Sequence, residues 1–197
     1  MMLKNATIYF GYGSNLWLEQ MNHRCPTSQY LGIGRLHGYR WMINERGYAN
    51  VVATSRPAVT IPESNVNITN VSYGLVYSLQ PKDEAGLDIN EGVPVAYEKK
   101  MLPIDFWPLR TDGKTIDVRD EPEKSEMLVY INRKQVADSA PKEEYIYRMN
   151  MGIRDAVKQG VPQAYIDKSL RPFIPDKRDA KVRATAEQQA LKFKDEK

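Results

Sequence analysis

The pattern of apolar and polar residues predicts strands through the first two thirds of the chain and helices at its end. Short runs of β-branched and aromatic residues, bounded by glycine, proline or polar clusters, are typical of strands. Such runs occupy residues 8–10, 30–43, 48–54, 71–79, 97 onward, 116–118 and 127–131. Strands that come first, with helices inserted and then appended, predict an α+β fold.

Three segments beyond the first turn have helical patterns, which cover residues 81–90, 142–159 and 162–170. The segments 81–90 and 162–170 both begin with proline. Proline suits the first position of a helix because the backbone N–H at that position has no partner within the helix. Within the second, apolar residues recur every three or four positions, which predicts an amphipathic helix that ends at Gly160. The apolar face of that helix comprises Tyr145, Met149, Ile153 and Ala156.

Two stretches carry few side chains large enough to build a core. Residues 55–67 contain Pro57 and Pro62 and predict a loop. Residues 176–197 hold seven basic and five acidic side chains, which is typical of a solvated helix or a frayed end; a basic binding arm is the alternative. We therefore expect a single domain over residues 1–175, followed by a polar, basic tail over residues 176–197.

The composition is that of an ordinary globular protein. Among 197 residues, 28 basic and 25 acidic side chains give a net charge of +3, which is too small to indicate nucleic-acid binding. The single cysteine, Cys25, excludes an intramolecular disulfide and suits a reducing compartment. No apolar run approaches the roughly 20 residues of a membrane span, and the first residues do not resemble a signal peptide. We expect a cytoplasmic protein that binds neither nucleic acid nor membranes.

The first candidate site is the glycine turn between an apolar run and a helical segment. Gly11 and Gly13 end the run at residues 8–10, and Ser14 and Asn15 are good helix N-caps ahead of residues 16–21. A strand, a glycine turn and a helix start leave backbone N–H groups pointing the same way, where they can hold a carboxylate, a phosphate or an oxyanion. A plain strand-to-helix turn is the alternative. The spacing matches neither GxGxxG nor GxxxxGK[ST].

Common catalytic constellations are missing from the sequence. With two histidines and one cysteine, no metal-binding spacing of Cys and His exists, and there is no GxSxG elbow. Cys25 and a histidine could form a nucleophilic pair, but a cysteine that simply packs at the end of the first helix is the better interpretation.

Glu91 is the second candidate. It ends the helical segment 81–90 and precedes Gly92, Val93 and Pro94, so its backbone is constrained and its surroundings become apolar. A carboxyl group in such a place can serve as a general acid or base. A surface turn residue is the alternative.

Taken together, these two stretches resemble the gamma-glutamylcyclotransferase family. The stretches are Tyr9-Phe10-Gly11-Tyr12-Gly13-Ser14-Asn15-Leu16 and, about 75 residues later, Leu87-Asp88-Ile89-Asn90-Glu91-Gly92-Val93. The similarity covers roughly residues 8–172, and residues 43–50 look like the fungal branch. Two departures are Gly11, where alanine is usual, and a spacing from Glu91 to Tyr97 about one residue shorter than in the animal enzymes.

The resemblance implies a small β-barrel flanked by helices, with a substrate cavity at the glycine turn. It implies release of 5-oxoproline from a γ-glutamyl amine or peptide, with Glu91 as the general acid and base. The substrate-binding residues that it implies are Tyr9, Phe10, Gly11, Tyr12, Gly13, Ser14, Asn15, Tyr97 and Tyr145. The resemblance implies no cofactor or metal. The expected partner is a small γ-glutamyl substrate. The resemblance leaves open whether the protein forms a homodimer.

Two alternatives accompany this interpretation. The protein could be a tailoring enzyme that removes γ-glutamyl from a glutathione adduct in fungal specialised metabolism. It could also be a non-catalytic ligand-binding or interaction member of the family, although the presence of Glu91 argues against that.

Overall fold

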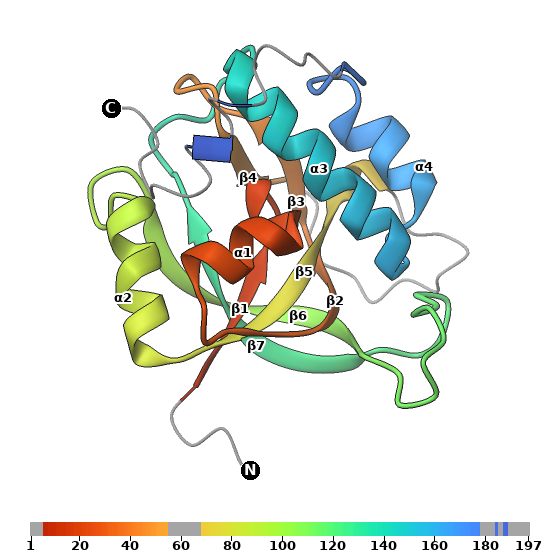
Figure 1. Ribbon diagram of the computed structural model, residues 1–197. Coiled ribbons are helices and arrows are strands. Elements are labelled where there is room, and N and C mark those ends of the chain that lie inside the picture. The colour runs from red at the N-terminus through yellow and green to blue at the C-terminus, as the bar shows by residue number, and fades with distance from the viewer. Residues whose placement is uncertain (1–5, 55–67, 178–183, 185–186, 189–197) are drawn as a thin grey trace.

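The computed structural model describes residues 6–54, 68–177, 184, 187 and 188, and its centre is a closed β-barrel (Figure 1). The five strands are β1 (Thr7–Gly11), β2 (Gln29–His37), β5 (Val71–Leu79), β6 (Glu98–Pro108) and β7 (Glu123–Ile131). Their order around the barrel is β1-β5-β2-β6-β7. Neighbouring strands are antiparallel except β1 and β7, which lie parallel where Tyr9 is opposite Leu128 and so close the barrel.

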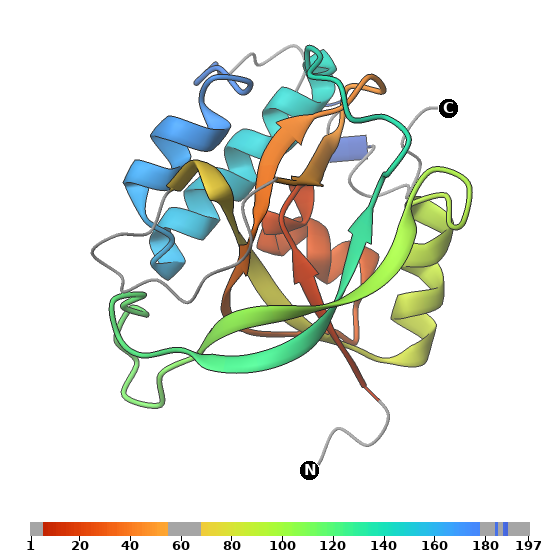
Figure 2. The ribbon, with the colours of Figure 1, turned by 180° about the vertical axis from the view of Figure 1, so that it is seen from behind.

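A two-stranded sheet and several helices surround the barrel. The sheet pairs β3 (Tyr39–Ile43) with β4 (Ala49–Ala53). The helices are α1 (Leu18–Arg24), α2 (Pro81–Asn90), α3 (Glu143–Gln159) and α4 (Gln163–Tyr165), with a π-helical turn at Ile166–Leu170 and 3-10 turns at Ser14–Leu16 and Ile68–Asn70. Helices α3 and α4 lie on one side of the barrel and α2 on the other, as the two opposite views show (Figures 1 and 2). The predicted α+β fold, a small β-barrel flanked by helices, is confirmed.

The position of β5 in the barrel explains why this strand is buried along its whole length. Every residue of β5 is buried, so both of its faces exclude water. Gly34 of β2 is paired with Gly74 of β5, and a Cβ atom on either glycine would come within 2.7 Å of the Phe10 ring. The two glycines therefore make the space that Phe10 fills, and Phe10 is fully buried there.

Strand β6 contains two prolines and nevertheless runs without interruption. Pro103 pairs with Glu126 of β7, and the pairing of β6 with β2 begins only at Ile104. Pro108 pairs with Gly32 of β2, beyond the point where the pairing with β7 ends. Each proline thus lies where the strand has a neighbour on one side only, so the missing N–H costs no ladder hydrogen bond.

The strand predicted at residues 116–118 is wrong. Those residues form a loop, although the side chains of Ile116 and Val118 are buried. The loop packs on the end of α3, where Gly160 has a φ of +120° and a Cβ atom would lie 2.2 Å from the Ile116 carbonyl oxygen. Burial in this loop comes from contact with a helix end rather than from strand pairing. The helix predicted to end at Gly160 is confirmed.

Some of the remaining sequence predictions concern residues that the structure does not describe, and the others can be compared with it. The loop predicted at residues 55–67, and most of the tail predicted beyond residue 175, lie outside them. The helix predicted at residues 81–90, with its N-terminal proline, is confirmed as α2. Within the described part of the chain, no helix is both long enough and apolar enough to cross a membrane.

Candidate active site

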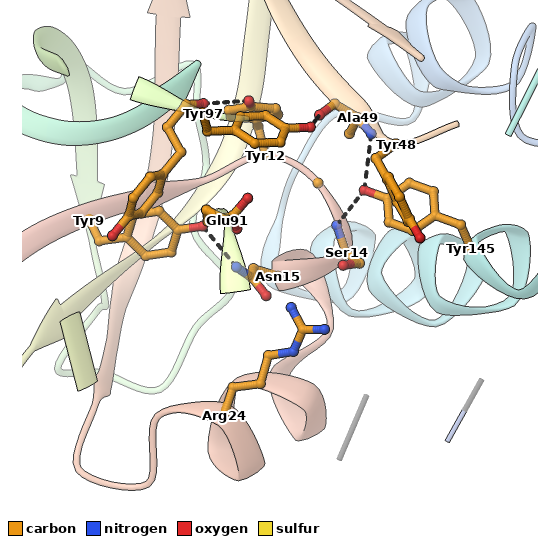
Figure 3. Close-up of a pocket in the computed structure, with 12 residues that line it drawn as sticks. Tyr9, Tyr12, Ser14, Asn15, Arg24, Tyr48, Ala49, Glu91, Tyr97 and Tyr145 are labelled. Carbon is orange, nitrogen blue, oxygen red and sulfur yellow. Dashed lines mark hydrogen bonds between the residues drawn. The ribbon is translucent and has the colours of Figure 1, made fainter. Parts of the chain in front are cut away.

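A cavity lies where the chain leaves β1, and segments from across the sequence contribute to its wall (Figure 3). Tyrosines predominate among the lining residues, together with one carboxylate and one guanidinium group. The lining residues are Tyr9, Tyr12, Gly13, Ser14, Asn15, Arg24, Tyr48, Ala49, Glu91, Tyr97, Tyr130 and Tyr145.

The turn after β1 is held by its own side chains. The Ser14–Leu16 segment is a 3-10 turn, and α1 begins only at Leu18. The Nε2 atom of Gln20 donates hydrogen bonds to the Ser14 Oγ at 3.0 Å and to the Asn15 Oδ1 at 2.9 Å. Asn15 in turn donates from Nδ2 to the Tyr9 hydroxyl at 2.9 Å. The prediction that Ser14 and Asn15 act as helix N-caps is therefore wrong, because neither side chain caps a helix and both instead fix the turn.

Tyr145 of α3 reaches the same turn from the other side. Its hydroxyl oxygen accepts hydrogen bonds from the backbone N–H of Ser14 at 3.1 Å and from the backbone N–H of Ala49 at 3.3 Å. A Cβ atom at position 13 would lie 2.8 Å from this hydroxyl. Glycine is thus needed at position 13 because Tyr145 comes so close to the backbone.

Two other tyrosine hydroxyls are bound to backbone carbonyl groups around the cavity. The Tyr97 hydroxyl donates to the Ala49 carbonyl at 2.9 Å, and the Tyr12 hydroxyl donates to the Tyr130 carbonyl at 2.5 Å. The Tyr130 hydroxyl donates to the Asp88 carboxylate, on α2, at 2.7 Å. Since these bonds join the barrel, β4 and α2, the cavity wall is held from several elements at once.

One acidic and one basic side chain line the cavity. Glu91 follows the last residue of α2, and its N–H donates to the Leu87 carbonyl at 2.8 Å, so the helix end fixes its backbone. Gly92, which follows, has a φ of +61° and turns the chain away. Arg24 is the last residue of α1 and is 4% exposed. Among the described residues that line the cavity, Glu91 is the one carboxylate and Arg24 the one cation.

Three of the cavity tyrosines are kept in their neutral form. Burial raises the pKa of Tyr9, Tyr12 and Tyr130 far above the ordinary value, and the negative charge of Glu91 raises the pKa of all three further. At neutral pH these phenols can donate hydrogen bonds but cannot act as bases. Glu91 is the carboxylate among the described residues of this wall, and a carboxylate can act as a base.

Cys25 lies outside this cavity. The residue is fully buried, and burial raises the pKa of its thiol to about 12, so the thiol is protonated at neutral pH. His23, by contrast, lies 3.9 Å from Glu19 on the exposed side of α1. The nucleophilic pair is not formed, and Cys25 packs as predicted.

The structure brings together most of the residues predicted for the site. Eight of them line the cavity, namely Tyr9, Tyr12, Gly13, Ser14, Asn15, Glu91, Tyr97 and Tyr145. Phe10 and Gly11 do not line it. Phe10 points into the barrel core because neighbouring residues of a strand face opposite sides, so Tyr9 faces the cavity and Phe10 faces away.

Sequence reasoning missed four lining residues, which are Arg24, Tyr48, Ala49 and Tyr130. Three of them lie in or beside predicted strands, where aromatic and small residues are ordinary. Arg24 ends the first helix two residues before Pro26, and nothing in that local sequence marks its side chain as buried. Among the described residues, no group of three or more His, Cys, Asp or Glu side chains could hold a metal ion.

Neither a protein-family model nor a curated protein sequence matches the chain. Solved structures do share its fold. A structure described as a gamma-glutamyl cyclotransferase superposes with a TM-score of 0.66 at 18% identity, covering 93% of this chain and 99% of that one. The uncharacterized protein loc79017 from Homo sapiens superposes with a TM-score of 0.64 at 19% identity, with coverage of 93% and 99%.

YkqA from Bacillus subtilis is also similar, with a TM-score of 0.59 at 18% identity. The match covers 86% of this chain but 54% of YkqA. At these identities the similarity concerns the fold alone. The chain thus has the gamma-glutamyl cyclotransferase fold, an α+β barrel with its cavity at the glycine turn.

Proposed function

We propose that this protein is a gamma-glutamylcyclotransferase, which releases 5-oxoproline from a γ-glutamyl amino acid, peptide or adduct. One observation carries the proposal. Glu91 and the turn Tyr12–Asn15, far apart in the sequence, line the same cavity. The shared fold with a structure described as a gamma-glutamyl cyclotransferase supports it.

The reaction needs little machinery from the protein. The α-amine of the substrate attacks the γ-carbonyl carbon of the same molecule, which forms a new C–N bond and closes a five-membered ring. The bond from that carbon to the leaving nitrogen then breaks, and 5-oxoproline and the free amine are released. Holding the γ-glutamyl chain folded supplies the effective concentration that drives the attack.

Glu91 suits the proton transfers of this reaction. Its carboxylate takes a proton from the attacking amine and returns it to the departing nitrogen, so the net proton count is unchanged. The Tyr9 hydroxyl, whose oxygen accepts a hydrogen bond from Asn15, and the backbone N–H groups of the turn are donors for the oxygen on which negative charge develops. Because the Ser14 N–H now donates to Tyr145, a substrate oxygen at this donor replaces the Tyr145 hydroxyl or shares the donor with it.

A panel of γ-glutamyl compounds tests the proposal. The purified protein is incubated with γ-glutamyl amino acids, γ-glutamyl dipeptides, glutathione and glutathione adducts, and 5-oxoproline is measured. Release from adducts alone would identify the tailoring enzyme. Binding without 5-oxoproline from any compound would contradict the proposal and favour a non-catalytic protein.

A further inference from the structure

Gln20 of α1 is buried beside the candidate active site but is not among the residues that line its cavity. The two N–H groups of its side chain donate to the Ser14 Oγ at 3.0 Å and to the Asn15 Oδ1 at 2.9 Å. Its Oε1 atom, by contrast, is buried and has no hydrogen-bond partner among the described residues. A buried polar atom without a partner is costly. The fold therefore holds this amide in place for the sake of its two donors.

The hydrogen bonds to Ser14 leave its hydroxyl group able to donate. A hydroxyl group has one O–H donor and two lone pairs. One lone pair of Ser14 accepts the hydrogen bond from Gln20, and the fully buried Arg148 donates to the same oxygen at 3.5 Å. Since both neighbours donate, the further hydrogen bond that Ser14 can form is one in which its own proton is given. Ser14 lines the cavity, so a ligand there meets this donor.

The same amide acts on the Tyr9 hydroxyl through Asn15. Because the Asn15 Oδ1 accepts from Gln20, its Nδ2 lies on the other side of the amide and donates to the Tyr9 hydroxyl oxygen at 2.9 Å. Turning the Gln20 amide over would place its oxygen against the Asn15 oxygen, and both can only accept. Tyr9 keeps its proton, because burial raises the pKa of this phenol far above the ordinary value. Tyr9 lines the cavity as well and is a second donor there.

Tyr9 and Ser14 lie on either side of Asn15 (Figure 3). Two donors held apart in this way suit two separate oxygen-bearing groups of one ligand. The head of a γ-glutamyl compound carries two such groups, which are the α-carboxylate and the γ-carbonyl. We propose that Gln20 is a positioning residue that keeps the protons of the Ser14 and Tyr9 hydroxyls directed at the oxygen atoms of the γ-glutamyl head. This inference rests on the proposed function.

A double-mutant cycle tests whether Gln20 acts through Ser14. The variants are Ser14→Ala, Gln20→Met and the two together, and kcat/KM is measured for the γ-glutamyl amide with the best leaving amine of the panel. Methionine is unbranched, as glutamine is, but it has no N–H group to donate. Asn150→Leu is the control, because Asn150 is a buried amide that donates to the Pro175 carbonyl at 2.9 Å and does not line the cavity.

We expect Ser14→Ala to lower kcat/KM by roughly 10- to 100-fold, which is usual for the loss of a hydrogen bond to a charged group. Gln20→Met should lower it by roughly 3- to 10-fold, because the hydroxyls remain but their protons are no longer held in place. When Ser14 is already alanine, Gln20→Met should have a smaller effect. A second cycle with Tyr9→Phe should show the same pattern, and Asn150→Leu should leave kcat/KM unchanged.

Two results would overturn the proposal. Gln20→Met could have the same effect with and without each hydroxyl, which would mean that the amide only supports the fold. Alternatively, neither Ser14→Ala nor Tyr9→Phe could lower kcat/KM, and this result does not depend on a Gln20 variant that folds. If the wild type releases no 5-oxoproline from the whole panel, the proposed function fails and this inference fails with it. Release of 5-oxoproline that is unaffected by these substitutions refutes this inference alone.

Discussion

The hydroxyl oxygen of Tyr145 accepts a hydrogen bond from the backbone N–H of Ser14 at 3.1 Å. The N–H of Ala49 donates to the same oxygen at 3.3 Å. One phenol from α3 thus satisfies two buried donors, one from the glycine turn and one from the start of β4. The position of this oxygen marks a point where two backbone donors converge.

Replacing Tyr145 with phenylalanine should destabilise the fold. The change removes the acceptor and leaves two buried N–H groups without it, so we expect the free energy of unfolding to fall by about 1–3 kcal/mol. Urea denaturation followed by circular dichroism measures this. Tyr147→Phe, on the same helix but only partly buried, is the control and should change stability by less than about 0.5 kcal/mol. Equal stability of the two variants would show that the two hydrogen bonds to Tyr145 contribute nothing.

Gly13→Ala should damage the site more than Gly11→Ala. A Cβ atom at position 13 would lie 2.8 Å from the Tyr145 hydroxyl and 3.1 Å from the Ala49 Cβ, whereas at position 11 the nearest atoms are 3.3 Å away. We expect Gly13→Ala to cost about 1–3 kcal/mol of stability, as overpacking usually does. Turnover of the best γ-glutamyl substrate should fall with it, since Tyr145 and the turn are pushed apart. Thermal unfolding and initial rates on both variants check this; a milder effect at position 13 than at position 11 would contradict the geometry.

Stability should fall at alkaline pH because of the buried tyrosines. Burial raises the pKa of Tyr9, Tyr12, Tyr77 and Tyr130 above the ordinary value of 10.0. These groups stabilise the folded state fully below pH 10, and this contribution is lost as the pH rises above 10, because the unfolded chain then loses protons that the folded chain keeps. Each such tyrosine should lower the free energy of unfolding by about 1.4 kcal/mol per pH unit in that range.

An alkaline titration measures this effect. Absorbance at 295 nm reports phenolate formation, and circular dichroism reports folding in the same samples. We expect only part of the 12 tyrosines to ionise near pH 10, and the remainder to ionise only when the circular dichroism signal is lost. Ionisation of every tyrosine near pH 10 in a folded protein would refute the prediction.

The parts of the fold that sequence could predict are those set by local pattern. β5 is a run rich in β-branched and aromatic residues that is stopped by Pro81, and α3 is an amphipathic repeat stopped by Gly160, so composition and periodicity suffice for both. The loop at residues 116–118 has the same apolar pattern as a strand, but its burial comes from a helix end distant in the sequence. Pattern alone cannot tell packing from strand pairing.

The candidate site likewise contains residues that could be selected from the sequence and residues that could not. The glycine turn and Glu91 could be selected because each has an unusual local sequence. Arg24 could not be selected, because its burial depends on how α1 meets the turn and α2, and the helix end by itself is typical of a solvated residue. The Tyr145 hydroxyl was implicated only through a family resemblance, and its two backbone partners emerge only from the tertiary structure.

Glu91→Gln is the decisive variant for the proposed chemistry. Glutamine keeps the shape and most hydrogen bonds of glutamate but cannot take up and return a proton. We expect kcat to fall by roughly 10²- to 10⁴-fold while KM changes by only a few fold, because a positioned acid and base contributes to the transition state rather than to binding. Steady-state rates of 5-oxoproline release provide both constants.

Glu126→Gln, at an exposed position of β7, is the matched control and should leave both constants unchanged. Glu91→Ala is less informative, since it also opens space in the cavity. Turnover by Glu91→Gln close to that of the wild type would show that Glu91 has a structural role and that another group moves the proton.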